Sequence, residues 1–279
     1  MVKSKTPRFL VHYWRNVPLV RIPIIAKMLE AVYYVYEKAL MKQVMSGERP
    51  THLAVILDGN RRYARSLGLE SWVGHFYGAE KVREFLEWCW ELGIKIVTLY
   101  AFSTENFNRP REEVEKIMKL AEEKFHEIAE SEEIHKYKVR VKAIGRIELL
   151  PERVREAIRR AEEATKDYNK YLLNVAIGYG GRAEIVDAVR KIAQKVANGE
   201  LRVEDINEKI IEEHLYTAGV PDPDLIIRTS GEERLSGFLL WQSAYSELYF
   251  CSAYWPEVRK IDLLRAIRDY QMRERRFGK

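Results

Sequence analysis

Short apolar segments alternate with longer amphipathic segments along most of this 279-residue chain. The short segments have the length and apolar character of buried β-strands, and the longer ones have helical periodicity. Strands are predicted at residues 52–57, 94–102, 139–144, 172–177, 225–228 and 238–241, and helices at 76–92, 110–131, 151–168, 182–197, 203–216 and 261–275. Strands separated by helices of this length pair in parallel. The pattern therefore predicts an α/β fold with a mostly parallel central sheet flanked by helices.

Residues 51–279 contain no internal repeat, low-complexity block or long linker, and apolar residues form 47% of the chain. We therefore expect a single domain over residues 50–279, with enough apolar side chains for a sizeable core. An N-terminal extension over residues 1–49 precedes it. This extension consists of a basic leader and an amphipathic helix that begins at Ile24 and ends near Gly47.

The formal net charge of +5 is unevenly distributed along the chain. Residues 1–29 contain six basic residues and no acidic one, so the remaining 250 residues sum to −1. A globally basic chain would suggest nucleic acid as a partner, but here the body is nearly neutral and lacks a platform of basic and aromatic residues. The surplus charge instead suits a leader that rests against an anionic membrane.

The predicted N-terminal helix is amphipathic. Its apolar face consists of Ile24, Ile25, Met28, Leu29, Val32, Tyr36 and Leu40. This face either packs on the protein's own core or lies on a membrane surface, and the sequence leaves both interpretations open. No segment reaches the roughly 18 apolar residues of a membrane span. Two cysteines, Cys89 and Cys251, exclude a disulfide framework. We expect a cytoplasmic protein with peripheral membrane contact.

Ligands of parallel sheets bind at the carboxyl ends of the strands, so polar residues at those positions are the candidates for a site. The first predicted strand is followed by Asp58-Gly59-Asn60-Arg61-Arg62-Tyr63. A rigidly held carboxylate, a glycine that permits close backbone approach and two arginines at a helix start form an anion site. Asp58 is also suited to carrying Mg²⁺ to a phosphate. The alternative is a helix capped by Asp58, with arginines on the surface.

Two further polar clusters follow later strands, at residues 103–110 and 228–236. Together with the first cluster they bring four arginines to one edge of the sheet, namely Arg62, Arg109, Arg228 and Arg234. Convergent guanidinium groups with one or two carboxylates predict a doubly ionised ligand such as a diphosphate. Glu247, after the apolar run 238–245, is either a second metal carboxylate or an ordinary edge residue. The chain has no GxxxxGK[ST], GxGxxG, HExxH or DDxxD motif.

Five linked motifs resemble those of the cis-prenyltransferases, the family of undecaprenyl and dehydrodolichyl diphosphate synthases. They are residues 58–64, Gly74-His75, residues 100–110, Gly180-Gly181-Arg182 and residues 228–250. They stand in the family's order, and the resemblance covers roughly residues 50–279. Arg61 beside Arg62, and Tyr63 where bacterial members usually have tryptophan, resemble the archaeal and eukaryotic branches.

The resemblance implies a reaction in which isopentenyl diphosphate is added repeatedly to an allylic diphosphate, with a new Z double bond each time. The product would be a long, undecaprenyl-like polyprenyl diphosphate, the precursor of a glycosyl carrier lipid. The resemblance further implies Mg²⁺ as cofactor, a hydrophobic tunnel between sheet and helices, and a homodimer in which the tail Arg276-Phe277-Gly278 reaches the partner's diphosphate. The archaeal character favours geranylgeranyl diphosphate over farnesyl diphosphate as primer.

The family pattern assigns roles to individual residues. Asp58 is the essential aspartate, and Asp58 and Glu247 bind the metal. The primer diphosphate is bound by Gly59, Asn60, Arg61, Arg62, Tyr63, Ser71 and His75. The loop that links the two substrates contains Ser103, Thr104, Glu105, Asn106, Phe107 and Arg109. Isopentenyl diphosphate is bound by Arg228, Arg234, Leu235 and Ser236, and Gly278 belongs to the tail.

Asn106 is sometimes described in the family as the proton acceptor. A carboxamide is not basic at neutral pH, so we expect Asn106 to orient other groups. A diphosphate oxygen, or a relay through His75 and Ser103, is the better base.

Ser71 stands where many members have an arginine, and Glu233 where bacterial members often have histidine. The full set of aspartate and arginines argues against a catalytically silent partner subunit. A protein that only binds membranes would leave those arginines unexplained.

Overall fold

The computed structural model describes the backbone of residues 23–273 and the side chains of residues 31–273. The chain divides into two compact units. In the described part of the chain, one comprises residues 49–258, and the other joins residues 23–48 to residues 259–273. The predicted N-terminal boundary near residue 49 thus coincides with a unit boundary, whereas the last helix groups with the N-terminal extension.

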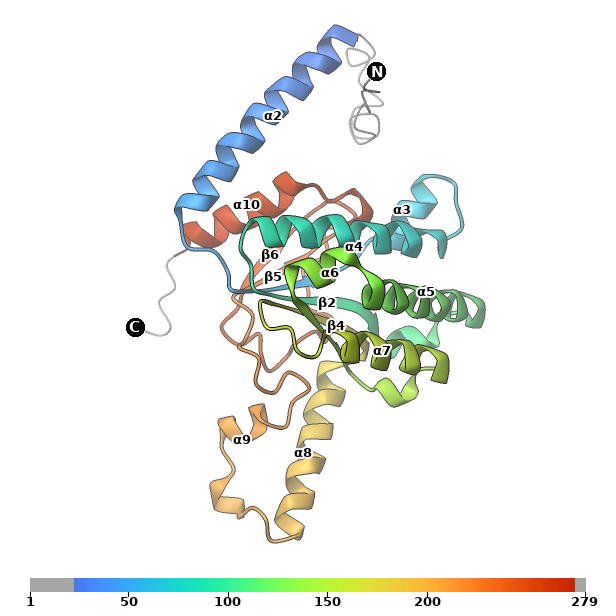
Figure 1. The fold of residues 1–279 in the computed structure, drawn as a ribbon, viewed down its shortest axis with the longest axis vertical. Coiled ribbons are helices and arrows are strands. Elements are labelled where there is room, and N and C mark those ends of the chain that lie inside the picture. The colour runs from blue at the N-terminus through green and yellow to red at the C-terminus, as the bar shows by residue number, and fades with distance from the viewer. Residues whose placement is uncertain (1–22, 274–279) are drawn as a thin grey trace. The chain divides into compact units, whose positions relative to one another are not determined.

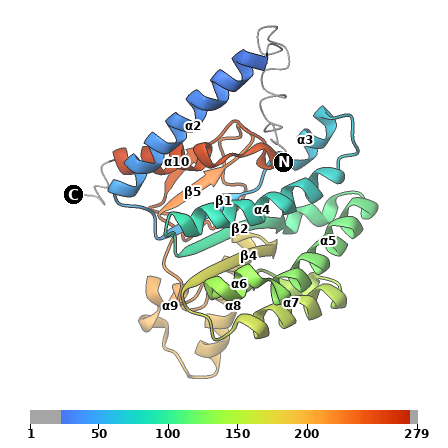
Figure 2. The same cartoon turned by 45° about the horizontal axis from the view of Figure 1, so that its top comes forward.

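The larger unit is built on a six-stranded sheet in the order β3-β4-β2-β1-β5-β6 (Figure 2). The strands are β1 (His52–Ile56), β2 (Ile96–Ser103), β3 (Val139–Ile144), β4 (Tyr171–Tyr179), β5 (Leu225–Arg228) and β6 (Glu247–Phe250). All five pairings between neighbours are parallel. The predicted α/β fold with a parallel sheet is confirmed. Apolar runs such as residues 52–56, all buried, fit interior strands covered on both faces.

The α-helices of this unit connect the strands. They are α3 (Asn60–Ser66), α4 (Val73–Glu91), α5 (Arg111–Glu130), α6 (Glu132–Tyr137), α7 (Glu152–Thr165), α8 (Gly181–Ala197) and α9 (Glu208–Glu212). Helices α4, α5 and α7 lie along one face of the sheet, and α8 with α9 projects from it as an arm (Figure 1). Helix α4 ends where predicted because Gly93 has a left-handed backbone, with φ 75°. This lets the Ile94 N–H bond the Cys89 carbonyl at 2.9 Å.

Two predicted elements are wrong. Residues 238–241 form turns rather than a strand, and the last strand is residues 247–250. Phe238 and Leu239 are fully buried, which explains the apolar run, but the backbone of Leu239 is left-handed with φ 45°. The predicted helix 203–216 contains only a short 3₁₀ turn and α9, because the side chain of Asn207 caps a new helix through the Ile210 N–H. Helix α6 was not predicted, whereas α3 begins where a helix start was predicted after Gly59.

A row of polar side chains crosses the middle of the apolar sheet. His52 Nε2 lies 2.7 Å from Thr98 Oγ1, and Asn174 Nδ2 donates to the same oxygen at 3.1 Å. His52 Nδ1 contacts the Pro221 carbonyl at 2.7 Å. Burial lowers the pKa of His52, so this ring is neutral in the folded protein. These hydrogen bonds satisfy both ring nitrogens of His52 and the Thr98 hydroxyl, whereas Asn174 Oδ1 is buried without a partner.

The smaller unit consists of α2 (Pro23–Ser46) and α10 (Lys260–Met272). Leu40 and Val44 of α2 are buried, and the Gln271 amide donates to the Val44 carbonyl at 2.8 Å. Val32 and Val35 remain 57% and 65% exposed. The described part of α2 therefore packs with one stripe and leaves other apolar side chains in solvent; Ile24, Ile25, Met28 and Leu29 lie outside the described side chains. No described helix is long and apolar enough to cross a membrane.

Candidate active site

Three loops meet at the carboxyl edge of the sheet. Ile56 of β1 is in register with Tyr100 of β2 and with Arg228 of β5. Because these three strands are adjacent and parallel, the segments that follow them emerge side by side. The structure therefore brings together the polar clusters after residues 57 and 228, as predicted, and places the segment 103–109 next to them.

Asp58 lies between two arginines. Its Oδ2 accepts a hydrogen bond from Arg228 Nη2 at 2.8 Å, and its Oδ1 accepts from Arg62 Nη2 at 3.3 Å and from the Gly59 N–H at 2.6 Å. Partial burial opposes ionisation of this carboxyl, but Arg228, Gly59 and Arg62 outweigh it and hold its pKa below the ordinary value. The side chain is 28% exposed, so an ionised carboxylate faces the site.

Gly59 is required by the backbone at this point. Its φ is 101°, in the left-handed region, and a Cβ would lie 2.8 Å from the Tyr254 ring and 2.9 Å from Ser230 Cβ. The turn leads directly into α3, whose first residues are Asn60, Arg61 and Arg62. The predicted helix start after Gly59 is confirmed.

Arg62 and Arg234 share a carboxylate that sequence reasoning missed. Arg62 Nη1 donates to Glu232 Oε1 at 2.9 Å, and Arg234 also bonds Glu232. Arg62 further bonds the Ser230 hydroxyl, and its guanidinium lies 5.7 Å from the centroid of the Tyr254 ring. Glu232 thus binds two guanidinium groups at once.

Arg228 is nearly fully buried and acts as the centre of the cluster. It donates to Asp58, to the Ser236 hydroxyl at 2.8 Å and to the Arg234 carbonyl. Its Nε is buried without a hydrogen-bond partner. The loop that carries these partners includes Ser230, Ser236 and Leu239 in left-handed backbone, with φ of 74°, 50° and 45°. Leu235 packs against the buried core, next to Phe238.

A second cluster surrounds Glu113 of α5, which sequence reasoning also missed. A single oxygen, Oε1, lies 3.4 Å from Arg61 Nε, 3.3 Å from His75 Nε2 and 3.3 Å from Arg109 Nη1. The Glu113 side chain is only 8% exposed. Glu113 lies in the first turn of α5, and Arg109 precedes that helix, so only their closeness in sequence could have indicated the contact.

His75 is held neutral in this second cluster. Burial and then the positive charge of Arg109 lower its pKa to about 4, against the opposing effect of Glu113. At neutral pH the ring is therefore unprotonated and only weakly basic.

The linking loop is a 3₁₀ turn at residues 104–108. The Asn106 carboxamide oxygen accepts the Ser103 N–H at 3.1 Å. Phe107 packs edge-on against Phe102, with ring centroids 4.9 Å apart. Thr104 lies under Gly180, where a Cβ would come within 2.6 Å of Thr104 Oγ1. Asn106 thus orders the loop, in line with an orienting role.

Two predicted residues lie apart from these clusters. Ser71, in the turn between α3 and α4, accepts a hydrogen bond from Arg65 Nε at 2.8 Å. A guanidinium is therefore placed beside Ser71, although the sequence lacks the family's arginine there. Tyr63 packs edge-on against Tyr77, with centroids 5.5 Å apart. Gly278 and the rest of the tail lie outside the described residues.

Within one chain, Glu247 and Asp58 lie at opposite ends of the strands. Glu247 opens β6 and pairs with Leu225 at the amino end of β5, whereas Asp58 follows the carboxyl end of β1. Three residues of strand, about 10 Å, separate Leu225 from Arg228. Glu247 thus begins a strand rather than following one, and its role as a metal ligand stays a prediction.

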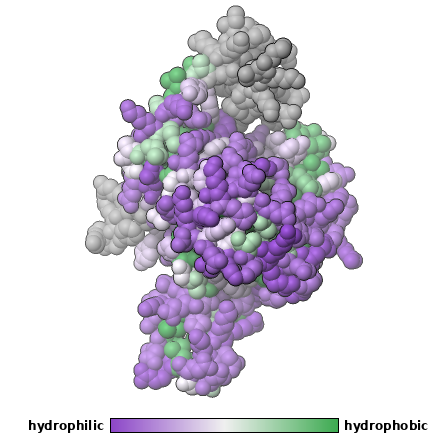
Figure 3. All heavy atoms as spheres, viewed as in Figure 1, coloured by the Kyte–Doolittle hydropathy of each residue, from purple (hydrophilic) through white to green (hydrophobic). Residues whose placement is uncertain are grey.

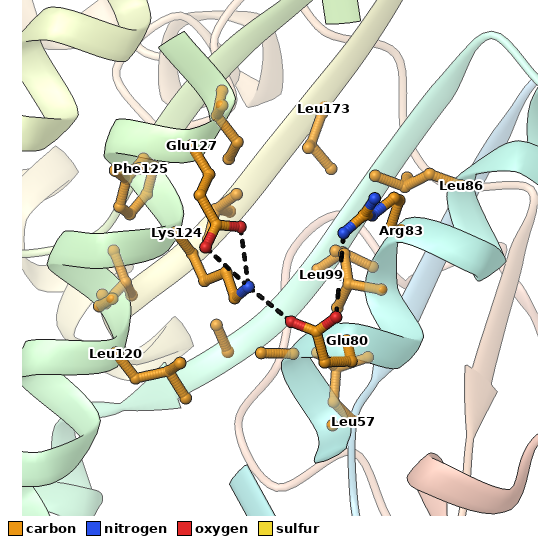
Figure 4. Close-up of a pocket in the computed structure, with 18 of the residues that line it drawn as sticks. Leu57, Glu80, Arg83, Leu86, Leu99, Leu120, Lys124, Phe125, Glu127 and Leu173 are labelled. Atoms are coloured by element: carbon orange, nitrogen blue, oxygen red, sulfur yellow. Dashed lines mark hydrogen bonds and ion pairs between the residues drawn. The ribbon is translucent and has the colours of Figure 1, made fainter. Parts of the chain in front are cut away.

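An apolar cavity of about 520 Å³ lies between the sheet and helices α4 and α5. Asn60 and His75 line it, so the cavity adjoins the polar clusters. Its walls are mainly aliphatic and aromatic, with Leu57, Leu86, Leu99, Leu120, Phe125 and Leu173 among them (Figure 4). The cavity lies where the hydrophobic tunnel was predicted, between sheet and helices. The arrangement suits an amphiphile with a phosphorylated head and a hydrocarbon tail.

Comparison with known proteins identifies the family. The model of the family described as "putative undecaprenyl diphosphate synthase" matches residues 56–278. This chain belongs to that prenyltransferase family. It is an enzyme that transfers prenyl groups, and its resemblance to the cis-prenyltransferases is thereby confirmed.

Several proteins of known name are similar to this prenyltransferase. The tritrans,polycis-undecaprenyl-diphosphate synthase (geranylgeranyl-diphosphate specific) of Methanocaldococcus jannaschii is 61% identical over 250 residues, which are 89% of each chain. The protein of the same name from Methanopyrus kandleri is 59% identical over 90% of this chain and 93% of its own.

Two solved structures are also similar to this chain. Lavandulyl diphosphate synthase from Lavandula x intermedia, in complex with dimethylallyl diphosphate, matches with a TM-score of 0.78 and 39% identity, over 83% of this chain and 99% of its own. A probable undecaprenyl diphosphate synthase from Campylobacter jejuni matches with a TM-score of 0.68 and 36% identity, over 83% of this chain and 100% of its own.

Proposed function

We propose that this prenyltransferase adds isopentenyl diphosphate repeatedly to an allylic diphosphate, in a Mg²⁺-dependent reaction that makes a long, undecaprenyl-like Z-polyprenyl diphosphate. The product serves as precursor of a glycosyl carrier lipid, and the primer is geranylgeranyl diphosphate in preference to farnesyl diphosphate. The main observation behind this proposal is that two arginine–carboxylate clusters adjoin an apolar cavity. The names of the archaeal relatives support the choice of primer and product.

The two clusters divide the two substrates between them. Isopentenyl diphosphate binds to Arg228, Arg234 and Ser236, where Glu232 and Asp58 hold the guanidinium groups in place. The primer diphosphate binds to residues 59–62, near His75. Its hydrocarbon enters the apolar cavity. Two polyanions repel one another unless both are neutralised, and the convergent arginines provide that charge.

The residues at Asp58 fit a magnesium ion. The carboxylate is ionised, and Oδ2 accepts one hydrogen bond, from Arg228, which leaves a lone pair for a cation. No three His, Cys, Asp or Glu side chains gather into a metal site in the described part of the chain. Substrate phosphate oxygens must then supply other ligands, as Mg²⁺ commonly requires. When bound, Mg²⁺ stabilises negative charge on the departing diphosphate.

The chemistry breaks one bond to oxygen and forms one between carbons. The primer's C1–O bond breaks, and its electron pair leaves with the diphosphate. The double-bond electrons of isopentenyl diphosphate then form a bond from its C4 to C1 of the primer, and loss of a proton from its C2 creates the new double bond. Arg62 and Arg228 stabilise charge on the diphosphates as the bond breaks.

The proton passes to an oxygen of the diphosphate. Asn106 is not basic, and its carboxamide oxygen is already occupied by the Ser103 N–H. A pKa of about 4 makes His75 a weak base. We therefore assign His75 to positioning Arg109 and the primer, and the diphosphate oxygen remains the strongest base at the site.

The test is incubation with labelled isopentenyl diphosphate, Mg²⁺ and each allylic primer in turn, with products separated by chain length. We expect multiple additions, faster with geranylgeranyl than with farnesyl diphosphate. A chain that elongates neither primer is a silent subunit, which contradicts the proposal. Equal use of both primers contradicts the primer preference alone.

A homodimer and peripheral membrane contact complete the proposal. The dimer rests on the tail Arg276-Phe277-Gly278 and predicts a mass of two chains in light scattering; a fully active monomer would contradict it. The membrane contact rests on the basic leader and on the exposed Val32 and Val35 of α2. Replacing both valines by serine is expected to weaken sedimentation with anionic vesicles, while unaltered binding would contradict this contact.

A further inference from the structure

The apolar cavity has a charged stretch of wall between α4 and α5 (Figure 4). Lys124 Nζ of α5 lies 2.7 Å from Glu80 Oε1 of α4, and 2.8 Å from Glu127 Oε2 one turn along α5. Arg83 Nη2 lies 3.9 Å from Glu80 Oε2. We call these four side chains the α4–α5 bridge, and all four line the cavity.

The bridge lies well away from the diphosphate end of the cavity. Glu113, beside His75, and Lys124 are eleven positions apart on the same helix, which is about 16 Å along its axis. A prenyl chain of a few five-carbon units spans such a distance. A hydrocarbon that grows from the Asp58 end therefore reaches the bridge during elongation.

The surroundings of the bridge are apolar on the cavity side. Leu86, Leu120 and Leu173 lie around it in Figure 4, and the aliphatic stem of Lys124 lies along the same wall. The charged ends face solvent: the Lys124 side chain is 27% exposed and the Glu80 side chain 60%. The bridge thus marks the place where the apolar wall changes into a hydrated, charged one.

Hydrocarbon gains nothing by lying against hydrated charges, because covering them removes water without replacing its hydrogen bonds. The pKa of Lys124 is raised despite burial, by hydrogen bonds to Glu127 and Glu80, so the amine stays charged. An exposed ion pair nevertheless adds little to stability. The bridge is therefore better suited to limiting the length of prenyl chain that the cavity binds than to stabilising the fold.

We propose that Lys124 and Glu80, which bridge α4 and α5 over the apolar cavity, are product-length determinants of this enzyme. The inference rests on the proposed chain elongation. Each further unit beyond the bridge loses apolar contact with the protein, so release of the product overtakes further addition at that length.

Lys124→Met tests the proposal directly, because methionine keeps an unbranched side chain and removes the charge. With primer and isopentenyl diphosphate fixed, we expect the mean product to lengthen by at least one five-carbon unit. Glu80→Gln should shift it in the same direction. The double variant should shift no further than the larger single effect, since both changes break one bridge. Lys119→Met is the matched control: Lys119 is an exposed lysine of the same helix, paired with Glu123, and its product pattern should be unchanged.

The outcomes separate this inference from the proposed function. A wild type that elongates, with Lys124→Met and Glu80→Gln giving wild-type product lengths, overturns the inference alone. A lowered melting temperature without a change in length also overturns it, because that is the signature of a purely structural ion pair. If Lys124→Met fails to fold, Glu80→Gln decides by the same criterion. A wild type without elongation would instead refute the proposed function.

Discussion

The two carboxylates at the sheet edge, Asp58 and Glu113, both bind arginines but in different settings. Asp58 is 28% exposed, and its two oxygens are divided between Arg62 and Arg228. Glu113 is 8% exposed and gathers Arg61, His75 and Arg109 around one oxygen. The open carboxylate can take a new ligand, whereas the closed one can only hold its neighbours. The difference fits our proposal that Asp58 meets substrate, and it suggests that Glu113 positions the groups that do.

Replacing Asp58 by asparagine is expected to have the largest effect. The shape is kept, but the negative charge between two arginines is lost, and with it the proposed ligand for Mg²⁺. We expect kcat to fall by about 10³-fold, on the scale of losing a main electrostatic contact to the transition state. Steady-state kinetics at saturating Mg²⁺ measures this. Asp167→Asn, an exposed residue, is the control, and equal activity of the two variants would contradict the role of Asp58.

Glu113→Gln should have a smaller effect on activity, because Glu113 touches no substrate. We expect kcat/KM for the allylic primer to fall about 10- to 100-fold, since Arg61 and Arg109 lose the group that aligns them. The melting temperature should also fall, because three cationic or polar groups lose a buried counterion. Glu115→Gln on the same helix removes only a surface pair with Arg153. If both variants behave alike, Glu113 is not a positioning residue.

Arg65→Ala tests a third charged group of the site, the exposed guanidinium beside Ser71. An exposed charged contact is worth about 1 kcal/mol, so KM for the allylic primer should rise roughly fivefold. Adding Ser71→Arg to this variant should restore KM, because the positive charge returns to the same place. Initial rates at varied primer concentration measure both effects. No change in KM would mean that Arg65 contacts only Ser71.

A separate effect is expected on stability as a function of pH. The pKa of His75 is about 4 in the folded protein and about 6.5 in an unfolded chain. Between these values the unfolded chain binds a proton that the folded protein does not. The contribution of neutral His75 is therefore complete above pH 6.5 and lost as the pH falls toward 4.

Denaturant unfolding at pH 7.5, 6 and 5, with His75→Asn for comparison, isolates this contribution from that of His52. We expect the wild type to lose more stability on acidification than the variant. Parallel curves would show that His75 titrates normally in the folded protein.

The Asp58 cluster was accessible from the sequence because its parts follow predicted strands. In a parallel sheet, the ends of neighbouring strands lie together whatever the loops do, so Asp58, Arg62 and Arg228 could be placed without coordinates. Glu113 lies in a helix, and its meeting with Arg61 and His75 depends on how α5 packs beside α3 and α4. Glu247 shows the same limit, since an apolar run that turns and an apolar run that extends look alike in sequence.

The apolar character of the cavity was predicted from the sequence, but the charged residues in its wall were not. Amphipathic helices over a parallel sheet imply an apolar layer, and the family resemblance implied a tunnel. Which charged side chains interrupt its wall depends on the rotation of α4 and α5 about their axes. From the sequence alone, Lys124 and Glu80 therefore look like ordinary surface charges. Only the packing of α4 beside α5 shows that they pair.

Three residues of the loop around Arg228 carry a further consequence. Ser230, Ser236 and Leu239 all have left-handed backbone, which costs about 1–3 kcal/mol for each non-glycine residue. Two of them use that conformation to aim a hydroxyl at Arg62 or Arg228. A change of Leu239 to glycine would relieve this backbone cost but remove a fully buried side chain, which costs about 2–5 kcal/mol, so the free energy of unfolding would fall. The buried Leu239 side chain therefore anchors the strained loop, and the loop is already shaped around Arg228 before substrate arrives.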